Sequence, residues 1–204
     1  MVRRSRGERK GTPADLLAVG LGNPGEEYAR TRHNAGAWVI DELVRRHDGR
    51  LRRGKRANAL SDELSVGSRR LAVATPTTFM NESGRAVVPL VRRYGIEDLR
   101  RLVVVHDELD LPVGRLKLKF GGGMAGNKGL RSIRNHLHTD EFARIRIGVG
   151  KPDSDTMKGR DYVLRRPART ERPELERMVA EAADAIEYLL DGDIETAMNR
   201  FNSG

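Results

Sequence analysis

The stretch that decides the fold runs through residues 19–28, VGLGNPGEEY, and continues two residues later into residues 31–36, TRHNAG. An apolar run at residues 16–19 predicts a β-strand that ends in this glycine- and proline-rich turn. Glycine lets a backbone approach a ligand closely, so the turn is a candidate binding site. Apolar residues at helical spacing then predict a helix over residues 36–47, directly behind His33. Side chains at such boundaries stay accessible, which makes His33 a candidate catalytic residue.

The glycine spacing Gly20-x-Gly22-x-x-Gly25 also matches the fingerprint of a dinucleotide-binding unit. That fingerprint requires a helix at the third glycine and an acid at the end of the following strand, about 20 residues further on. Here Asp41 and Glu42 fall inside the predicted helix, and no strand intervenes. We therefore reject a nicotinamide site, although the turn considered alone is also compatible with a tight turn that binds nothing.

The composition favours one basic domain. A chain of 204 residues suffices for one well-buried α/β domain and is short for two. Lysine and arginine number 38 against 29 acids, a net charge of +9, which favours a polyanionic partner but also fits a solvated basic surface without one. Cysteine is absent, which excludes a thiol nucleophile and a disulfide framework and suits the cytoplasm.

Targeting segments are not recognisable in the sequence. Residues 1–13 are basic but lack the apolar segment of a secretory signal, and no run of 18 apolar residues could span a membrane. We therefore expect a soluble, cytoplasmic protein with a flexible basic tail over residues 1–13 and one domain over residues 14–204.

The rest of the chain predicts alternating strands and helices. Apolar runs or alternation indicate strands at residues 59–66, 70–74, 102–105, 115–120 and 144–150. Helical spacing indicates one helix that ends near residue 94, a second that begins after residue 127 and a third over residues 173–190. The strands at residues 59–66 and 70–74 form a predicted hairpin about Gly67-Ser68. Thr78 or Asn81 is a candidate cap for the helix that follows them. The expected order β-α-β-β-α-β-β-α-β-α-α corresponds to a single three-layer α/β domain with a central mixed β-sheet flanked by helices.

Polar residues follow the continuous apolar strand at residues 102–105, beginning with His106 and Asp107. Open α/β sheets place their sites at such strand ends. A nucleophilic triad is poorly supported because the chain has no cysteine and no Gly-x-Ser-x-Gly elbow, and the histidines lack a complete metal-ligand set. We therefore expect no metal and no cofactor, and interpret His33 as a base with Asp107 as its orienting carboxylate. A purely structural histidine remains the alternative.

Basic residues recur at positions suited to phosphate. Residues 115–120 and 144–150 alternate aliphatic and basic side chains, which places Lys119 and Arg146 on basic faces. The glycine-rich loop at residues 121–129 opens a helix and is suited to an anion. Residues 45–56 form a dense basic block, which we interpret either as a phosphate contact or as a solvated loop.

Seven runs together resemble bacterial-type peptidyl-tRNA hydrolases, and the resemblance extends from about residue 15 to residue 202; they are residues 20–28, 31–36, 75–84, 106–112, 121–130, 146–150 and 198–202. The resemblance implies hydrolysis of the ester between a peptide's carboxyl end and the 3′-terminal ribose of tRNA, which rescues tRNA released by the ribosome. The implied partner is tRNA carrying a peptide, and we expect a monomer. A rival from the same fold is a non-catalytic RNA-binding relative, similar to plant organellar splicing factors.

The resemblance also implies roles for individual residues. His33 is similar to the family's general base and Asp107 to its orienting carboxylate, and both argue against the non-catalytic rival, as do the site asparagines. Substrate binding is implied for Asn23, Tyr28, Met80, Asn81, Asn127 and Lys128. Lys119 and Arg146 are similar to the basic clamp that receives the tRNA 5′-phosphate.

One motif departs from the family. The usual Gly-His-Asn-Gly is replaced by Gly126-Asn127-Lys128-Gly129, so Lys128 stands where the substrate-binding asparagine is expected. That asparagine's role therefore does not pass unchanged to Lys128, and Asn127 does not inherit it simply by being an asparagine. Lys128 either lies in the site, turns to solvent or pairs with a carboxylate such as Glu108.

Overall fold

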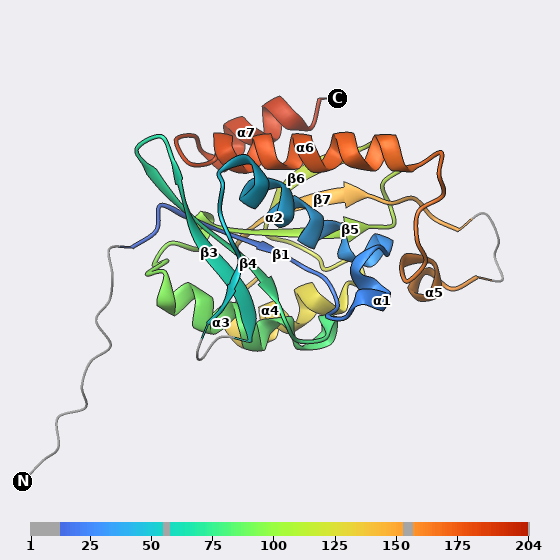
Figure 1. Ribbon diagram of the computed structural model, residues 1–204, viewed down its shortest axis with the longest axis horizontal. Helices are drawn as coiled ribbons and strands as arrows, with labels where there is room; N and C mark the ends of the chain where they lie inside the picture. Colours follow the sequence, from blue (N-terminus) through green and yellow to red (C-terminus); the bar gives the residue numbers. More distant parts are fainter. Residues whose placement is uncertain (1–12, 55–57, 153–156, 204) are drawn as a thin grey trace, which may run out of the picture.

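A seven-stranded mixed sheet forms the middle layer of the computed structural model, which describes residues 13–54, 58–152 and 157–203 (Figure 1). The strands are β1 Leu16–Gly20, β2 Arg52–Arg53, β3 Ala59–Val66, β4 Arg69–Pro76, β5 Leu102–Glu108, β6 Leu116–Phe120 and β7 Ala143–Gly148. Their spatial order is β2-β3-β4-β1-β5-β7-β6. The four central strands β4, β1, β5 and β7 run parallel, and the remaining pairs are antiparallel.

Helices cover both faces of the sheet. The helices are α1 Glu26–Ala29, α2 Ala35–Arg46, α3 Ser83–Arg93, α4 Lys128–Leu137, α5 Gly159–Val163, α6 Arg172–Tyr188 and α7 Ile194–Phe201, with 3₁₀ turns η1 Arg32–Asn34, η2 Met80–Glu82 and η3 Leu99–Arg101. Helices α2, α6 and α7 lie on one face, and α3 and α4 on the other (Figure 1). The fold is therefore the three-layer α/β arrangement that the sequence predicts.

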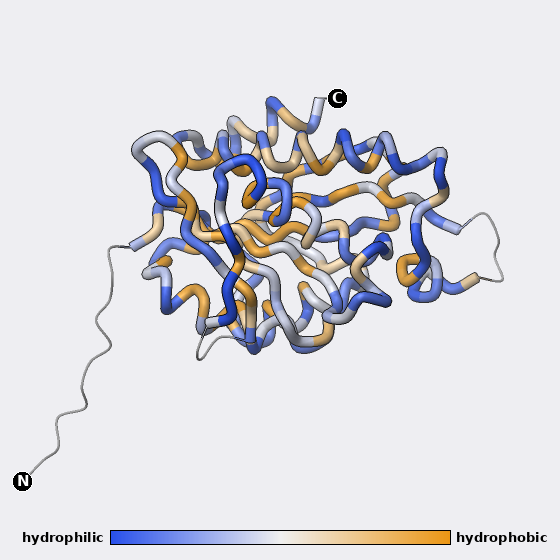
Figure 2. The backbone as a smooth tube through the Cα atoms, in the orientation of Figure 1, coloured by the Kyte–Doolittle hydropathy of each residue, from blue (hydrophilic) through white to orange (hydrophobic). Residues whose placement is uncertain are grey.

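Strand β5 shows why both faces need cover. All seven of its residues are buried; Val103 and Val105 face α2, whereas Leu102 and Val104 face α3 and α4. Figure 2 shows the hydrophobic segments gathered along these central strands. Burial on both sides explains the continuous apolar pattern at residues 102–105. The buried polar residues at the end of the strand, His106, Asp107 and Glu108, each have a hydrogen-bond partner.

Several short features differ from the predictions. The hairpin of β3 and β4 about Gly67 is confirmed, but β2, α1 and α5 were not predicted. Neither Thr78 nor Asn81 caps α3, so that prediction was wrong: η2 runs directly into α3, and Glu82 occupies the cap position without a side-chain hydrogen bond to the helix backbone. The predicted tail lies outside the described residues except for Pro13.

The basic block at residues 45–56 is partly engaged within the fold. Arg45 and Arg46 pair with Glu42, and Arg46 also reaches acids of α6. Strand β2 follows as an exposed edge strand beside β3. Residues 55 and 56 of the block lie outside the described part of the chain.

Close packing at Gly20 and Gly36 brings residues 19–36 to the middle of the sheet. A Cβ on Gly36 would lie 2.3 Å from the carbonyl oxygen of Val105, and one on Gly20 would lie 2.1 Å from that of Gly36. Only glycine therefore lets the first turn of α2 sit against the ends of β1 and β5. This approach places the residues before α2, including His33, beside the carboxyl end of β5.

Candidate active site

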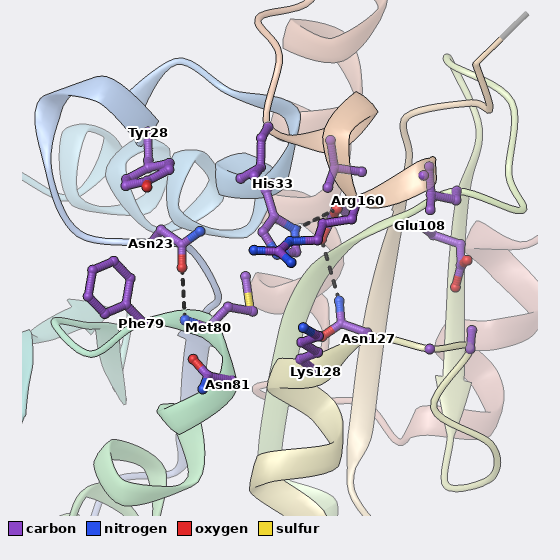
Figure 3. Close-up of a pocket in the computed structure, with 17 residues that line it drawn as sticks. Asn23, Tyr28, His33, Phe79, Met80, Asn81, Glu108, Asn127, Lys128 and Arg160 are labelled. Atoms are coloured by element: carbon purple, nitrogen blue, oxygen red, sulfur yellow. Dashed lines mark hydrogen bonds and ion pairs between the residues drawn. The ribbon is translucent and has the colours of Figure 1, made fainter. Parts of the chain in front are cut away.

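A pocket of about 480 Å³ opens at the carboxyl ends of β1, β4 and β5 (Figure 3). The residues that line it are Asn23, Tyr28, His33, Phe79, Met80, Asn81, Asp107, Glu108, Leu109, Ala125, Gly126, Asn127, Lys128, Gly159, Arg160, Val163 and Leu164. All the residues predicted for catalysis and substrate binding are among them. Ligand sites of open α/β sheets lie at this edge, where loops from neighbouring parallel strands meet.

His33 and Asp107 form a pair inside the pocket. Nδ1 of His33 lies 2.9 Å from Oδ2 of Asp107, and their side chains are 17% and 4% exposed. An ionised carboxylate only accepts hydrogen bonds, so the proton of the neutral ring lies on Nδ1. Within the described part of the chain Nε2 has no hydrogen-bond partner, and the ring can therefore present its lone pair to the pocket.

Asn127 holds the other oxygen of Asp107. Its Oδ1 caps α4 by accepting from the backbone N–H groups of Gly129 (2.9 Å) and Leu130 (3.1 Å). This fixes the orientation of the amide, so that Nδ2 donates to Oδ1 of Asp107 over 3.5 Å. Asp107 is thus held between a histidine from η1 and an asparagine from the start of α4.

Asn23 presents an amide donor to the pocket. Its Oδ1 accepts from the backbone N–H of Met80 (2.8 Å), which identifies the oxygen because that N–H can only donate. The backbone of Asn23 is held by the side chain of Asn34, which accepts from its N–H (3.0 Å) and donates to its carbonyl (2.9 Å). The Nδ2 group of Asn23 has no partner among the described residues (Figure 3).

The remaining predicted binding residues differ in their surroundings. Tyr28 lies edge-on to Phe79, with ring centroids 6.5 Å apart, and Met80 is 4% exposed at the pocket floor. Asn81 is exposed on η2. Lys128, the first residue of α4, is also exposed and has no ion pair within residues 13–54, 58–152 and 157–203. It lines the pocket and does not pair with Glu108.

Lys119 and Arg146 lie outside the pocket lining, on the neighbouring strands β6 and β7. The register pairs Lys119 with Arg144 and Lys117 with Arg146, so all four basic residues share one face of the sheet. Arg144 is buried and donates to the carbonyl of Gly123 (2.7 Å) and to that of Gly122, which holds the glycine-rich loop. Arg144 is therefore not available to a ligand, whereas Lys119 has no ion pair in the described segments.

Glu108 connects the basic face to the pocket. Its side chain is 4% exposed, lines the pocket and binds Nε and Nη2 of Arg146, each 3.0 Å from Oε2. The sequence contains an acid at this position, but periodicity does not show which cation it meets. Arg146 of the basic face is therefore bound to Glu108, the residue that follows Asp107 in β5.

His106, on the opposite face of β5 from Asp107, is fully buried. Nδ1 lies 2.7 Å from the carbonyl oxygen of Asp107, and Nε2 is buried without a described partner. Burial lowers the pKa of His106 below its ordinary value of 6.5, because the charged ring would lose its hydration. His106 is therefore folded into the sheet as a neutral side chain.

The buried His106 predicts a loss of stability in mild acid. As pH falls through about 6.5 the unfolded chain takes up a proton at this ring and the folded chain does not, so unfolding becomes easier, with a slope of up to about 1.4 kcal/mol per pH unit. Urea unfolding between about pH 7 and about pH 5 should show a shallower pH dependence for His106→Asn than for the wild type. Equal slopes in the two proteins would contradict this assignment, whatever their absolute stabilities.

Sequence reasoning missed several residues that build the site. Asn34 stands next to His33 but was not singled out, although a polar residue at a turn is a sign of bonds to the backbone. Phe79 and Glu108 lie within runs that resemble the family, residues 75–84 and 106–112, but no role in the pocket was assigned to them, and Arg160 lies in no such run. Arg160 lies on the five-residue helix α5, which has too short a pattern to be predicted.

A metal-binding cluster and a membrane-spanning helix are both absent from the described ranges. Residues 13–54, 58–152 and 157–203 contain no cluster of three or more His, Asp or Glu side chains arranged to hold a metal ion. The helices of the same ranges include none that is long and apolar enough to cross a membrane.

Comparisons with known proteins place the chain in a family. A family model described as peptidyl-tRNA hydrolase matches residues 17–204. Peptidyl-tRNA hydrolases from Rubrobacter xylanophilus and Mycobacterium marinum are 48% and 45% identical over 188 residues, which cover 91% and 92% of this chain and 99% and 97% of those relatives. The crystal structure of the Acinetobacter baumannii peptidyl-tRNA hydrolase matches with a TM-score of 0.86 and 34% identity, covering 95% of this chain and 97% of that one. Since these similarities extend over nearly the whole chain, the resemblance found in the sequence is confirmed, and the chain belongs to the peptidyl-tRNA hydrolase family of enzymes.

Proposed function

We propose that this chain hydrolyses the ester that joins a peptide to the 3′-terminal ribose of tRNA, with His33 as the general base. The observation that carries the proposal is the His33–Asp107 pair, 2.9 Å apart, in a pocket lined by amide side chains. The carboxylate keeps the ring proton on Nδ1, which leaves Nε2 to accept a proton from water. The family membership supports this choice of substrate.

The reaction follows from these groups. Nε2 of His33 takes a proton from a water molecule as the water oxygen bonds to the ester carbonyl carbon, which forms a tetrahedral intermediate. The bond from that carbon to the ribose oxygen then breaks, and the imidazolium returns the proton to the leaving ribose oxygen. Asp107 stays ionised throughout and stabilises the imidazolium.

Asn23 supplies a donor for the oxyanion. Its Oδ1 is occupied by the N–H of Met80, so only the NH₂ group faces the pocket. A donor held in place before the reaction stabilises the negative charge that develops on the carbonyl oxygen. Lys128 provides a cation at the pocket rim, which can donate to the same oxyanion or to the substrate but cannot accept a hydrogen bond as the family's asparagine does.

The basic face of β6 and β7 is proposed to bind the tRNA 5′-phosphate through Lys119 and Arg146. The face lies outside the pocket, as expected for a contact remote from the ester. The guanidinium of Arg146 has a fork of donors that suits a phosphate. Glu108 already binds Nε and Nη2, so Nη1 is the nitrogen left to bind the phosphate. Lys119 is the cation of this pair that lacks a described ion pair.

Lys119→Ala is therefore expected to raise KM more than it lowers kcat, because a remote contact binds the ground state and the transition state alike. The slope of log K against log salt should flatten by about 0.7–0.9 for the lost phosphate contact. Arg92→Ala, which removes an exposed cation of α3, is the control and should leave the slope unchanged. A slope equal to that of the wild type in Lys119→Ala would remove Lys119 from the clamp.

Release of free tRNA from a peptidyl-tRNA by the purified chain tests the proposed function directly. Multiple turnovers without added metal or cofactor are expected. Tight tRNA binding with no release would instead favour the non-catalytic RNA-binding alternative.

A further inference from the structure

Arg32 lies next to His33 in η1, but its side chain leaves the pocket and is buried. The side chain is 7% exposed, and its guanidinium meets the segment that connects α5 to α6. Nη1 donates to the carbonyl oxygens of Arg165 (3.3 Å) and Arg166 (3.0 Å), and Nη2 lies 2.5 Å from Oε2 of Glu171. The backbone N–H of Arg32 also donates to the carbonyl of Arg165 (3.1 Å). Every one of these contacts is made to residues more than 130 positions away in the sequence.

The face of the same guanidinium covers an aromatic ring. Cζ of Arg32 lies 4.2 Å from the centroid of Tyr162, within the range of a cation–π interaction. The Tyr162 hydroxyl donates to the carbonyl of Val149 (3.0 Å) and lies 3.5 Å from Oε1 of Glu171. Glu171 also accepts from the backbone N–H of Ala168 (2.6 Å). Arg32 therefore joins η1 to both ends of the α5–α6 connection.

The segment that Arg32 holds forms one wall of the pocket. Gly159, Arg160, Val163 and Leu164 line it, and all four belong to α5 or follow it directly (Figure 3). A helix of five residues is not stable by itself, so its position depends on tertiary contacts. Those contacts include the burial of Val163 in the core, the hydrogen bond from the Tyr162 hydroxyl to the carbonyl of Val149 and the stacking of Tyr162 on Arg32.

We propose that Arg32 is a positioning residue that sets the α5 wall of the pocket relative to His33. The inference rests on the proposed function. The base and the group that holds the α5 wall are consecutive residues, so η1 carries both at a fixed spacing. The part of the substrate that contacts α5 is thereby placed against the ester-cleaving ring.

Arginine suits this role because of its shape. The planar guanidinium binds two carbonyls and a carboxylate along its edge while its face stacks on Tyr162. Lysine keeps the charge but offers no planar face and no fork, so it cannot make these contacts together. Arg32→Lys therefore tests the geometry without removing a buried cation.

In Arg32→Lys, KM should rise about tenfold while kcat changes less than about threefold, because a loosened wall weakens binding in the ground and transition states alike. Hydrogen exchange of the α5 amides should also accelerate. The control is Arg169→Lys, the same chemical change at an exposed arginine of the same connection, which should alter neither quantity. An unchanged KM in Arg32→Lys would overturn the proposal, and so would a fall in kcat at constant KM, which would mean that Arg32 acts through His33.

A second variant keeps the test decisive if Arg32→Lys does not fold. Glu171→Gln retains the shape of the side chain but removes the charge that meets Nη2 and replaces one acceptor oxygen by an NH₂ donor. A rise in KM in Glu171→Gln supports the proposal, and wild-type kinetics overturn it. Absence of tRNA release by the wild type would contradict the proposed function instead, so the two failures are distinguishable.

Discussion

Replacing His33 by alanine is expected to lower kcat by roughly 10²–10⁴-fold, the usual contribution of positioned acid–base catalysis. Among the described residues, His33 is the only histidine in the pocket lining, and its Nε2 is the atom proposed to take the proton from water. Affinity for tRNA should survive, because the basic face of β6 and β7 lies outside the pocket. Single-turnover release of tRNA and equilibrium binding of uncharged tRNA would measure the two effects separately.

A surface histidine provides the control for this loss. His136, exposed on α4 and outside the pocket lining, should tolerate His136→Ala with little change in kcat. Parallel losses of tRNA binding and activity in His33→Ala would make His33 a structural residue and contradict its assignment as the base.

Asp107→Asn is expected to lower kcat by at least about tenfold, though less than His33→Ala, because it leaves the base present but disturbs its tautomer. The structure gives a specific reason. Nδ1 of His33 and Nδ2 of Asn127 each donate to a different oxygen of Asp107, whereas an asparagine has only one oxygen. If that oxygen faces Asn127, the new NH₂ group faces Nδ1 and forces the ring proton onto Nε2, where it blocks the base.

A compensating variant tests this explanation. In Asp107→Asn combined with Asn127→Asp, the carboxylate at position 127 can still cap α4 and can accept from the amide at position 107, whose oxygen then returns to Nδ1 of His33. Part of the lost kcat should be recovered relative to Asp107→Asn. Wild-type activity in the single variant would remove Asp107 from the mechanism, and an absence of recovery would contradict the proposed competition for its oxygens.

The predictable part of the fold is the part with its own local pattern. The apolar run at β5 reports burial on both faces and the alternation along β6 reports burial on one, and both patterns are formed by neighbouring residues in the sequence. The alternation along β7 indicates a strand but not the burial of Arg144 on its basic side. The elements that were missed, β2, α1 and α5, have five residues or fewer. Such short elements are formed by their contacts with the rest of the fold, so their own residues carry little signal.

The candidate site likewise divides into residues that local sequence patterns identify and residues that only tertiary contacts bring to the pocket. His33, Asp107 and Asn23 were identified because each follows or precedes a strongly patterned element, and the motifs around them resemble one family. Arg160 and Glu108 were not assigned, because a place in the pocket depends on which distant segments fold back beside them. Asn127 was a candidate for substrate binding, and only the structure relates it to the cap of α4 and to Asp107.

By itself the sequence determined the α/β class, the family and the residue types available for catalysis, since strand and helix periodicity and contiguous motifs are properties of neighbouring residues. The tertiary structure alone decided which atoms meet. His33 and Asp107 are 74 residues apart, and they form a pair because β1 and β5 run parallel and glycines at positions 20 and 36 let α2 approach their ends. The pairing of Arg146 with Glu108, and the link from Arg32 to the wall of the pocket, likewise depend on long-range packing that no local pattern records.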